Sequence, residues 1–170
     1  VVALGDSIIG LNAQSNVVQR MEECFKQCDC AAVIAFEEVP EHEVSQYGIA
    51  KPKSDDAFFE VLDIIEKPEL DEAPSNLAVA ARYIFTPKIF DALDRTEPGK
   101  GGEIQLTDAI KLLIEDGETV YGVRLTSDEH RYDIGNFESY FRAFTEFALA
   151  DEKHGGALRE YIASLNHNGS

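Results

Sequence analysis

Strand-like apolar stretches alternate along this chain with segments whose apolar residues recur at every third or fourth position. The strand-like stretches cover residues 1–4, 31–36, 47–51, 58–65, 77–85 and 120–125. A recurrence of three and four residues is the period of one face of a helix. Because strands that alternate with helices pack against one another in layers, this order predicts an α/β fold.

Capping residues and the apolar period together predict five helices. They are a helix capped by Ser15 or Asn16, a short helix after Thr86 and Pro87, a helix over residues 106–115, a helix capped by Asn136, and a helix over residues 157–165. In the short helix, Ile89, Phe90 and Leu93 are expected to point inward. The helix after Asn136 carries its aromatic residues on a single stripe, at positions 137, 140, 141, 144 and 147.

The sheet is expected to be mixed and to belong to a single domain. Residues 47–51 and 58–65 flank a short polar turn, so this pair is predicted to be antiparallel. The sequence shows no repeat and no clear boundary, which predicts one domain over residues 1–165 and a frayed tail over residues 166–170. Residues 1–4 read as a buried strand, and a chain seldom begins inside its own core. We therefore expect the chain to be the C-terminal part of a larger domain.

The net charge of −17 limits the partners that this chain can have. Nucleic acids call for basic patches, so no nucleic-acid partner is expected. No apolar run approaches the roughly 20 residues of a membrane span, so no membrane partner is expected either. An anionic substrate has to be held by local cations, amides or a metal ion against the overall field. The three cysteines, Cys24, Cys28 and Cys30, indicate a reducing compartment and hence the cytoplasm.

An acid and a base stand side by side where one apolar stretch ends, at Glu66 and Lys67. Pro68 follows, which biases Lys67 toward an extended backbone, on which neighbouring side chains point to opposite faces. A carboxylate accepts hydrogen bonds from sugar hydroxyls, and an ammonium group suits a phosphate. The pair can therefore hold two parts of one ligand. The alternative is an ordinary strand end with two solvated charges.

Two aspartates follow strand-like segments that lie far apart in the sequence. Asp6 comes directly after the first apolar stretch, and Asp133 lies between a strand and the cap residue Asn136. In layered α/β folds ligands bind at the carboxyl ends of the strands, so both carboxylates are expected at one edge of the sheet. Magnesium is often held by one or two carboxylates together with phosphates. The pair predicts a Mg²⁺ site, with a turn aspartate and a helix-capping loop as the structural alternatives.

Six short motifs follow one another along the chain. They are Gly5-Asp6, Tyr47-Gly48-Ile49, Glu66-Lys67-Pro68, Pro74-Ser75-Asn76-Leu77-Ala78, residues 102–110, and Asp133-Ile134-Gly135-Asn136. Their order resembles the bacterial UTP–glucose-1-phosphate uridylyltransferases, within the wider family of sugar-1-phosphate nucleotidyltransferases. The resemblance extends over residues 1–150. It implies a Rossmann-like three-layer α/β/α nucleotidyltransferase fold with a mixed sheet, of which this chain is the C-terminal part.

The resemblance implies a catalytic role for three of the matching residues. Asp6 and Asp133 resemble the two aspartates that hold the catalytic Mg²⁺. Lys67 resembles the lysine that binds the phosphate of the sugar substrate, where its positive charge offsets that of the phosphate. These three residues are therefore expected to carry the chemistry.

The resemblance also implies residues that bind the sugar. Gly48 resembles a glycine whose backbone lies against the sugar, and the absence of a Cβ allows such a close approach. Glu66 resembles the residue that accepts hydrogen bonds from the sugar hydroxyls. Asn76 is expected to help shape the sugar pocket. Residues 103–108 are expected either to support the site or simply to start a helix.

The implied reaction is the Mg²⁺-dependent transfer of a uridylyl group from UTP to glucose-1-phosphate, which gives UDP-glucose and pyrophosphate. A homo-oligomer is expected. Family members begin with a Gly-x-Gly-Thr-Arg-type loop that binds the nucleotide phosphates, and these 170 residues contain no such motif. The chain alone is therefore expected to be inactive and to carry the sugar and metal half of the site. Two alternatives stay open: a transferase that uses dTTP, CTP or ATP, and a non-catalytic module for assembly or regulation.

Overall fold

The computed structural model describes residues 1–10, 15–99 and 102–167. The contacts between residues divide the chain into two compact units. Unit 1 consists of Val1–Leu4 and Asn16–Thr126, and unit 2 consists of Gly5–Ser15 and Ser127–Ser170. Unit 2 thus combines two segments that are far apart in the sequence. A compact unit of contacts is not in itself a domain, so the expectation of one domain over residues 1–165 stays a prediction.

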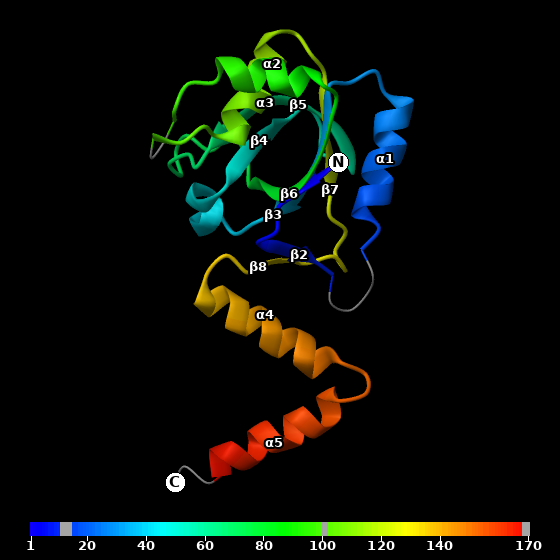
Figure 1. The fold of residues 1–170 in the computed structure, drawn as a ribbon, viewed down its shortest axis with the longest axis vertical. Coiled ribbons are helices and arrows are strands. Elements are labelled where there is room, and N and C mark those ends of the chain that lie inside the picture. The colour runs from blue at the N-terminus through cyan, green and yellow to red at the C-terminus, as the bar shows by residue number, and fades with distance from the viewer. Residues whose placement is uncertain (11–14, 100–101, 168–170) are drawn as a thin grey trace. The chain divides into compact units, whose positions relative to one another are not determined.

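The described residues of unit 1 form one six-stranded sheet and three α-helices (Figure 1). Its elements are β1 Val2–Ala3, α1 Val17–Gln27, β3 Ala32–Glu38, the 3₁₀ helix η1 Glu41–Gln46, β4 Gly48–Pro52, β5 Phe58–Glu66, β6 Leu77–Phe85, α2 Lys88–Arg95, α3 Leu106–Glu115 and β7 Val120–Arg124. The strand order is β1-β6-β3-β7-β5-β4, with a further contact between β6 and β4. The pair β3–β7 is parallel and the other pairs are antiparallel, so the predicted mixed sheet is confirmed.

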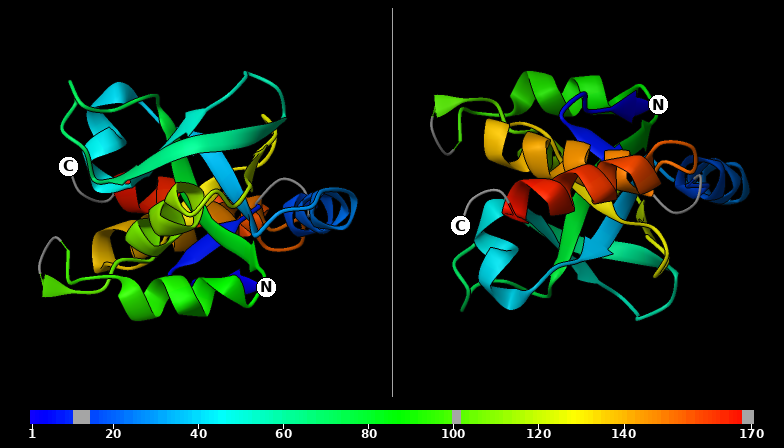
Figure 2. Two further views of the ribbon diagram at one scale, coloured as in Figure 1. Left: turned by 90° about the horizontal axis from the view of Figure 1, so that it is seen from above. Right: turned by 90° about the horizontal axis from the view of Figure 1, so that it is seen from below.

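The core of unit 1 forms on both faces of β3, which lies in the interior of the sheet. Ala32, Ile34 and Phe36 belong to the main apolar cluster, together with residues of α2 and α3. The intervening Val33 and Ala35 are fully buried outside that cluster, and α1 contacts β3, β6 and β7. The figures show α1 on a different side of unit 1 from α2 and α3 (Figures 1 and 2). A strand that is covered on both faces needs a continuous apolar sequence, which β3 has.

Two expectations about burial in unit 1 are wrong. Residues 1–4 do not form a buried strand, because only Val2 and Ala3 are in a strand and Val1 is 80% exposed. The reason is the position of β1, which is at the edge of the sheet and pairs with β6 alone. Phe90 does not point inward but is 67% exposed, since the buried face of α2 is centred on Ile89 and Ala92.

In unit 2, the described residues form a two-stranded ladder and two helices. Its elements are β2 Ser7–Ile9, β8 Arg131–Asp133, α4 Phe137–Ala150 and α5 Gly155–His167. The strands β2 and β8 pair antiparallel, with Ser7 opposite Asp133. Neither strand was anticipated, because three residues are too few to show a period. α5 reaches two residues into the segment that was expected to fray, and residues 168–170 lie outside the described residues.

Helix α4 begins where the sequence predicts it. The Asn136 side chain accepts a hydrogen bond from the amide of Ser139 at 3.0 Å, so the predicted cap is confirmed. The aromatic stripe, however, is largely exposed to solvent. Phe137, Phe141 and Phe144 are 79%, 59% and 62% exposed. Phe137 stacks on Phe141 and Tyr140 stacks on Phe144, while Tyr140 meets Phe141 edge to face. Over the residues that the structure describes, no helix combines the length and apolar character needed to cross a membrane.

Candidate functional site

The ends of β4 and β5 bring the first two expected sugar-binding residues together. Gly48, the first residue of β4, lies directly opposite Glu66, the last residue of β5. The Glu66 side chain is only 15% exposed, whereas that of Lys67 is 45% exposed. A carboxylate with so little contact with water has few conformations available, so its direction is set by the residues around it.

The prediction of an extended backbone at Lys67 is wrong. Lys67 has a φ of 47°, in the left-handed region that residues with a Cβ rarely adopt. Its amide donates a hydrogen bond to the carbonyl of Tyr47 at 2.9 Å, so a tertiary contact overrides the local bias of the residue before a proline. As a result the Lys67 Nζ lies 3.7 Å from the Glu66 Oε1 rather than on the opposite face. The acid and the base therefore present their polar atoms in one place.

The space beside Gly48 is filled by two side chains. A Cβ at this position would lie 2.9 Å from Thr107 Oγ1 and 3.2 Å from Glu66 Oε2. Both distances are shorter than almost all real contacts of a Cβ. The requirement for glycine at Gly48 thus has a cause within the protein itself, because a side chain here would displace Glu66 or Thr107.

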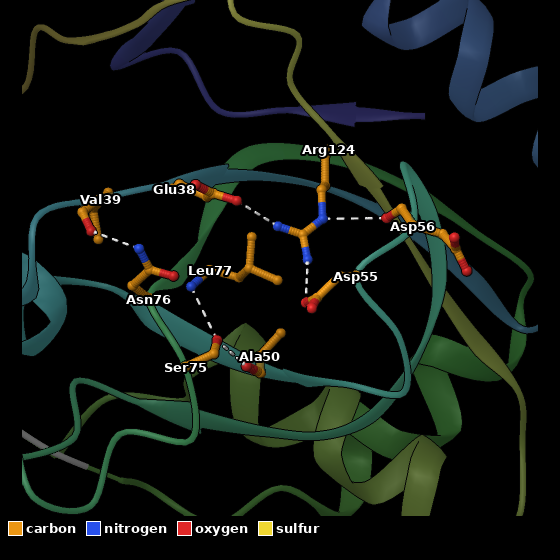
Figure 3. Close-up of polar contacts among 9 residues, drawn as sticks. All are labelled: Glu38, Val39, Ala50, Asp55, Asp56, Ser75, Asn76, Leu77 and Arg124. Atoms are coloured by element: carbon orange, nitrogen blue, oxygen red, sulfur yellow. Dashed lines mark hydrogen bonds and ion pairs between the residues drawn. The ribbon is translucent and has the colours of Figure 1, made fainter.

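Asn76 directly precedes β6, in a network of hydrogen bonds that joins β3, β4 and β6 (Figure 3). Its amide Nδ2 donates to the carbonyl of Val39 at 3.2 Å. The neighbouring Ser75 hydroxyl donates to the carbonyl of Ala50 at 2.6 Å and accepts from the amide of Leu77 at 3.0 Å. These bonds give Asn76 a structural role beside the β3 end. Its expected part in the sugar pocket stays a prediction.

Arg124, the last residue of β7, connects the other strand ends shown in Figure 3. Its guanidinium donates to the Glu38 carboxylate at 2.6 Å, to the Asp56 carbonyl at 3.2 Å and to the Asp55 carboxylate at 3.4 Å. It also lies over the ring of Phe59, 5.3 Å from the ring centre. Arg124 therefore links the turn between β4 and β5 to the ends of β3 and β7.

Unit 2 brings Asp6 and Asp133 together through the β2–β8 ladder. The amide of Ile134 donates to the carbonyl of Asp6 at 2.7 Å, directly after the pair of Ser7 with Asp133. A Cβ at Gly135 would lie 3.1 Å from Asp133 Oδ1 and 3.6 Å from Asp6 Oδ2. The two carboxylates therefore lie close to one point, although 127 positions separate them in the sequence.

The donor set of this pair suits a hard divalent cation. Both aspartates are exposed, and Asp133 Oδ1 also accepts a hydrogen bond from the amide of Gly135 at 2.8 Å, which orients it. Within the described ranges, no group of three or more histidines, cysteines and acids is placed to hold a metal ion. Two carboxylates alone fit Mg²⁺, which commonly takes one or two carboxylates and completes its shell with water and phosphates.

A model of the nucleotidyl transferase family matches residues 1–149 of the chain. This match covers well over half of the sequence and contains all six expected site residues.

The chain belongs to the nucleotidyl transferase family.

Several relatives of this nucleotidyl transferase carry a more specific name. It is 42% identical over 144 residues to a UTP–glucose-1-phosphate uridylyltransferase of Pseudomonas aeruginosa, which covers 84% of this chain and 50% of that protein. It is 37% identical over 166 residues to UTP–glucose-1-phosphate uridylyltransferase 1 of Staphylococcus saprophyticus, which covers 97% of this chain and 56% of that protein. The resemblance that the motifs indicate is confirmed. The chain spans about half the length of the curated relatives that it matches.

Solved structures agree with this relationship and with the predicted nucleotidyltransferase fold. A UDP-glucose pyrophosphorylase complexed with UDP-glucose has a TM-score of 0.75 and 36% identity, covering 83% of this chain and 52% of that one. A UTP-bound UGPase from Acinetobacter baumannii has a TM-score of 0.81 and 33% identity, covering 96% of this chain and 55% of that one.

Some residues of this nucleotidyl transferase that shape the site were not singled out from the sequence. Thr107 lies within a motif that was assigned only a supporting or helix-starting role, and Arg124 is one of many charged residues at strand ends. A polar residue in the first turn of an amphipathic helix is a weak signal, which could have drawn attention to Thr107. Nothing local distinguishes Arg124, because its partners come from three separate segments.

Proposed function

We propose that this chain carries the sugar-phosphate-binding and metal-binding residues of a UTP–glucose-1-phosphate uridylyltransferase. The reaction would transfer a uridylyl group from UTP to glucose-1-phosphate and give UDP-glucose and pyrophosphate. The observation that carries this proposal is the cluster of Gly48, Glu66 and Lys67, in which a shielded carboxylate and an exposed ammonium group lie 3.7 Å apart. The names of the relatives support the choice of uridylyl transfer.

In the proposed site, Glu66 accepts hydrogen bonds from sugar hydroxyls and Lys67 binds the phosphate of glucose-1-phosphate. An oxygen of that phosphate forms a bond to the α-phosphorus of UTP. The bond between the α-phosphorus and the bridging oxygen breaks, and pyrophosphate leaves with its electron pair. The attacking oxygen is already ionised near neutral pH, so the residues supply alignment and charge rather than a general base.

Asp6 and Asp133 are the residues that would hold Mg²⁺. The bound ion would neutralise and align the phosphate groups of the substrates. The exposed carboxylates leave room for phosphate oxygens and water as its further ligands. Because the 170 residues contain no Gly-x-Gly-Thr-Arg-type loop, we expect them by themselves to bind the sugar phosphate without turning it over.

The test is a pyrophosphate-release assay of the complete encoded protein with glucose-1-phosphate, Mg²⁺ and each of UTP, dTTP, CTP and ATP. We expect turnover with UTP, and its loss in Asp6→Ala and in Asp133→Ala with the unfolding temperature retained. Asp94→Asn, a change of an exposed acid on α2, is the matched control and should leave turnover unchanged. Preference for another nucleotide would overturn the uridylyl assignment, and no turnover with any nucleotide would favour a non-catalytic module.

Binding by the 170-residue chain is a separate test, made by calorimetry with glucose-1-phosphate. Glu66→Gln and Lys67→Met should each weaken binding by roughly tenfold or more, since each removes a charge-assisted contact. Equal affinity in wild type and in both variants would show that these residues do not form the sugar-phosphate site.

A further inference from the structure

Thr107 occupies an unusual position in the first turn of α3. It is the second residue of that helix and is 8% exposed, although threonine is usually found at the surface. Both branches of its side chain lie against Gly48, since a Cβ there would be 2.9 Å from its Oγ1 and 3.2 Å from its Cγ2. The same point lies 3.2 Å from Glu66 Oε2. The hydroxyl of Thr107 and the carboxylate of Glu66 therefore both border the space beside Gly48.

A helix-starting role does not account for this placement. The N-cap of α3 is Gln105, and its side chain makes no capping hydrogen bond. Thr107 follows the cap by two positions, and its side chain lies against Gly48, the first residue of β4. The packing of α3 on β5, the strand that ends at Glu66, holds it there.

We propose that Thr107 is a positioning residue for the carboxylate of Glu66. This inference rests on the proposed function, because it concerns how the sugar of a sugar-1-phosphate is held. In this role its hydroxyl would donate to the Glu66 carboxylate, while its methyl group lies against Gly48. Together they restrict the carboxylate to the direction from which it accepts hydrogen bonds from the sugar.

The physical reason is that a carboxylate contributes most to the free energy of sugar binding when it is already correctly oriented. A glutamate has three rotatable side-chain bonds. If they were free before the sugar binds, ordering them would cost conformational entropy and weaken binding. A hydrogen bond from a neutral hydroxyl to a carboxylate is short and charge-assisted.

The experiment compares Thr107→Val and Thr107→Ser in the complete encoded protein, with steady-state kinetics for both substrates. Valine keeps the shape but removes the hydroxyl, so the KM for glucose-1-phosphate should rise by roughly tenfold while the KM for UTP stays unchanged. Serine keeps the hydroxyl and should return the KM for glucose-1-phosphate close to the wild-type value. Thr96→Val is the matched control, because Thr96 is equally buried, at 8%, and lies at the end of α2.

A double-mutant cycle with Glu66→Gln distinguishes positioning from a direct contact with the sugar. If Thr107 acts through Glu66, Thr107→Val should change the KM by less than about twofold once Glu66 is replaced. Additive effects, or an unchanged KM in Thr107→Val, would overturn this inference while leaving the proposed function intact. A wild-type protein without any sugar-1-phosphate turnover would overturn the proposed function, and this inference with it.

Discussion

Gly48 has no room for a side chain, because other side chains fill the space beside its Cα. Gly48→Ala would place a Cβ 2.9 Å from Thr107 Oγ1 and 3.2 Å from Glu66 Oε2, so one of the two side chains must move. Overpacking of this kind costs about 1–3 kcal/mol of unfolding free energy. We expect the variant to lose stability in urea and to bind glucose-1-phosphate more weakly than wild type.

Gly156→Ala is the control for this prediction. Gly156 lies in α5 and has no atom within 4 Å of an added Cβ. Alanine in a helix is favoured over glycine by about 0.5–1 kcal/mol, so this variant should be as stable as wild type or more so. Equal stability of Gly48→Ala and wild type would contradict the packing that the structure shows at Gly48.

The thiols of α1 and the segment after it predict a loss of stability at alkaline pH. Burial and the neighbouring Cys28 thiol raise the pKa of Cys24 from 9.0 to about 12, and burial likewise raises the pKa of Cys30 to about 11. The folded state thus disfavours the thiolates, while the unfolded chain ionises near pH 9. The stabilisation is complete below pH 9 and is lost as the pH rises toward 11 and 12.

The measurement is the unfolding temperature at pH 8 and at pH 10.5, for wild type and for Cys24→Val. Valine cannot ionise, so the variant should lose less of its stability over this interval than wild type does. Reaction of the folded protein with iodoacetamide at pH 8 should also be slower at Cys24 than in urea. Parallel pH profiles for the two proteins would rule out a titrating Cys24.

At the scale of the elements, Arg124 holds the turn between β4 and β5. Arg124→Met removes three hydrogen bonds, one of them to the Asp56 carbonyl, and also removes the cation over the ring of Phe59. Glu38 and Asp55 are well exposed, so their ion pairs contribute little, and the total loss should be about 1–2 kcal/mol. Urea unfolding measures this change.

Arg142→Met is the matched control, because the Arg142 guanidinium makes only an exposed pair with Glu138, one helical turn away at 2.5 Å. Such a pair is worth about 0.3–0.5 kcal/mol. If both variants lost the same small amount of unfolding free energy, Arg124 would be an ordinary surface charge that does not stabilise the arrangement of the strand ends.

The elements also show which parts of the fold local patterns can predict. The β4–β5 pair and the start of α4 at Asn136 follow from turn residues and a capping residue, and both were predicted. The ladder of β2 with β8 was not, because each strand has three residues and their pairing joins distant segments. The sequence also predicted the aromatic stripe of α4 but not its exposure. Periodicity shows which residues share one face of a helix, and it does not show whether other residues cover that face.

At the scale of the whole molecule, the charge of −17 predicts a dependence on salt. Like charges repel one another more in the compact state than in the expanded chain, and salt screens this repulsion. The unfolding temperature should therefore rise between low and physiological concentrations of sodium chloride. A temperature that fell or stayed constant would indicate that local ion pairs outweigh the overall repulsion.

The homo-oligomer and the cytoplasmic location remain predictions, as does the use of Mg²⁺. Sedimentation of the complete encoded protein measures the oligomeric state. Titration of turnover against Mg²⁺ and Ca²⁺ measures the dependence on metal. Replacement of both Asp6 and Asp133 by Asn should remove the dependence on metal together with the activity, because the remaining residues offer no comparable pair of carboxylates on the β2–β8 ladder.

The sequence by itself determined the mixed α/β fold, through its alternating apolar patterns, and the order of its motifs indicated the family and the residues expected to bind sugar phosphate and metal. These follow from chemistry that a short segment carries, such as a glycine, a capping residue or an acid beside a base. Tertiary structure alone decided how those residues are arranged. The left-handed backbone of Lys67, the packing of Thr107 and Glu66 around Gly48, and the approach of Asp6 to Asp133 all arise from contacts between distant segments. The physical reason is that a local pattern specifies which groups are available, whereas their separation is set by the packing of the whole chain.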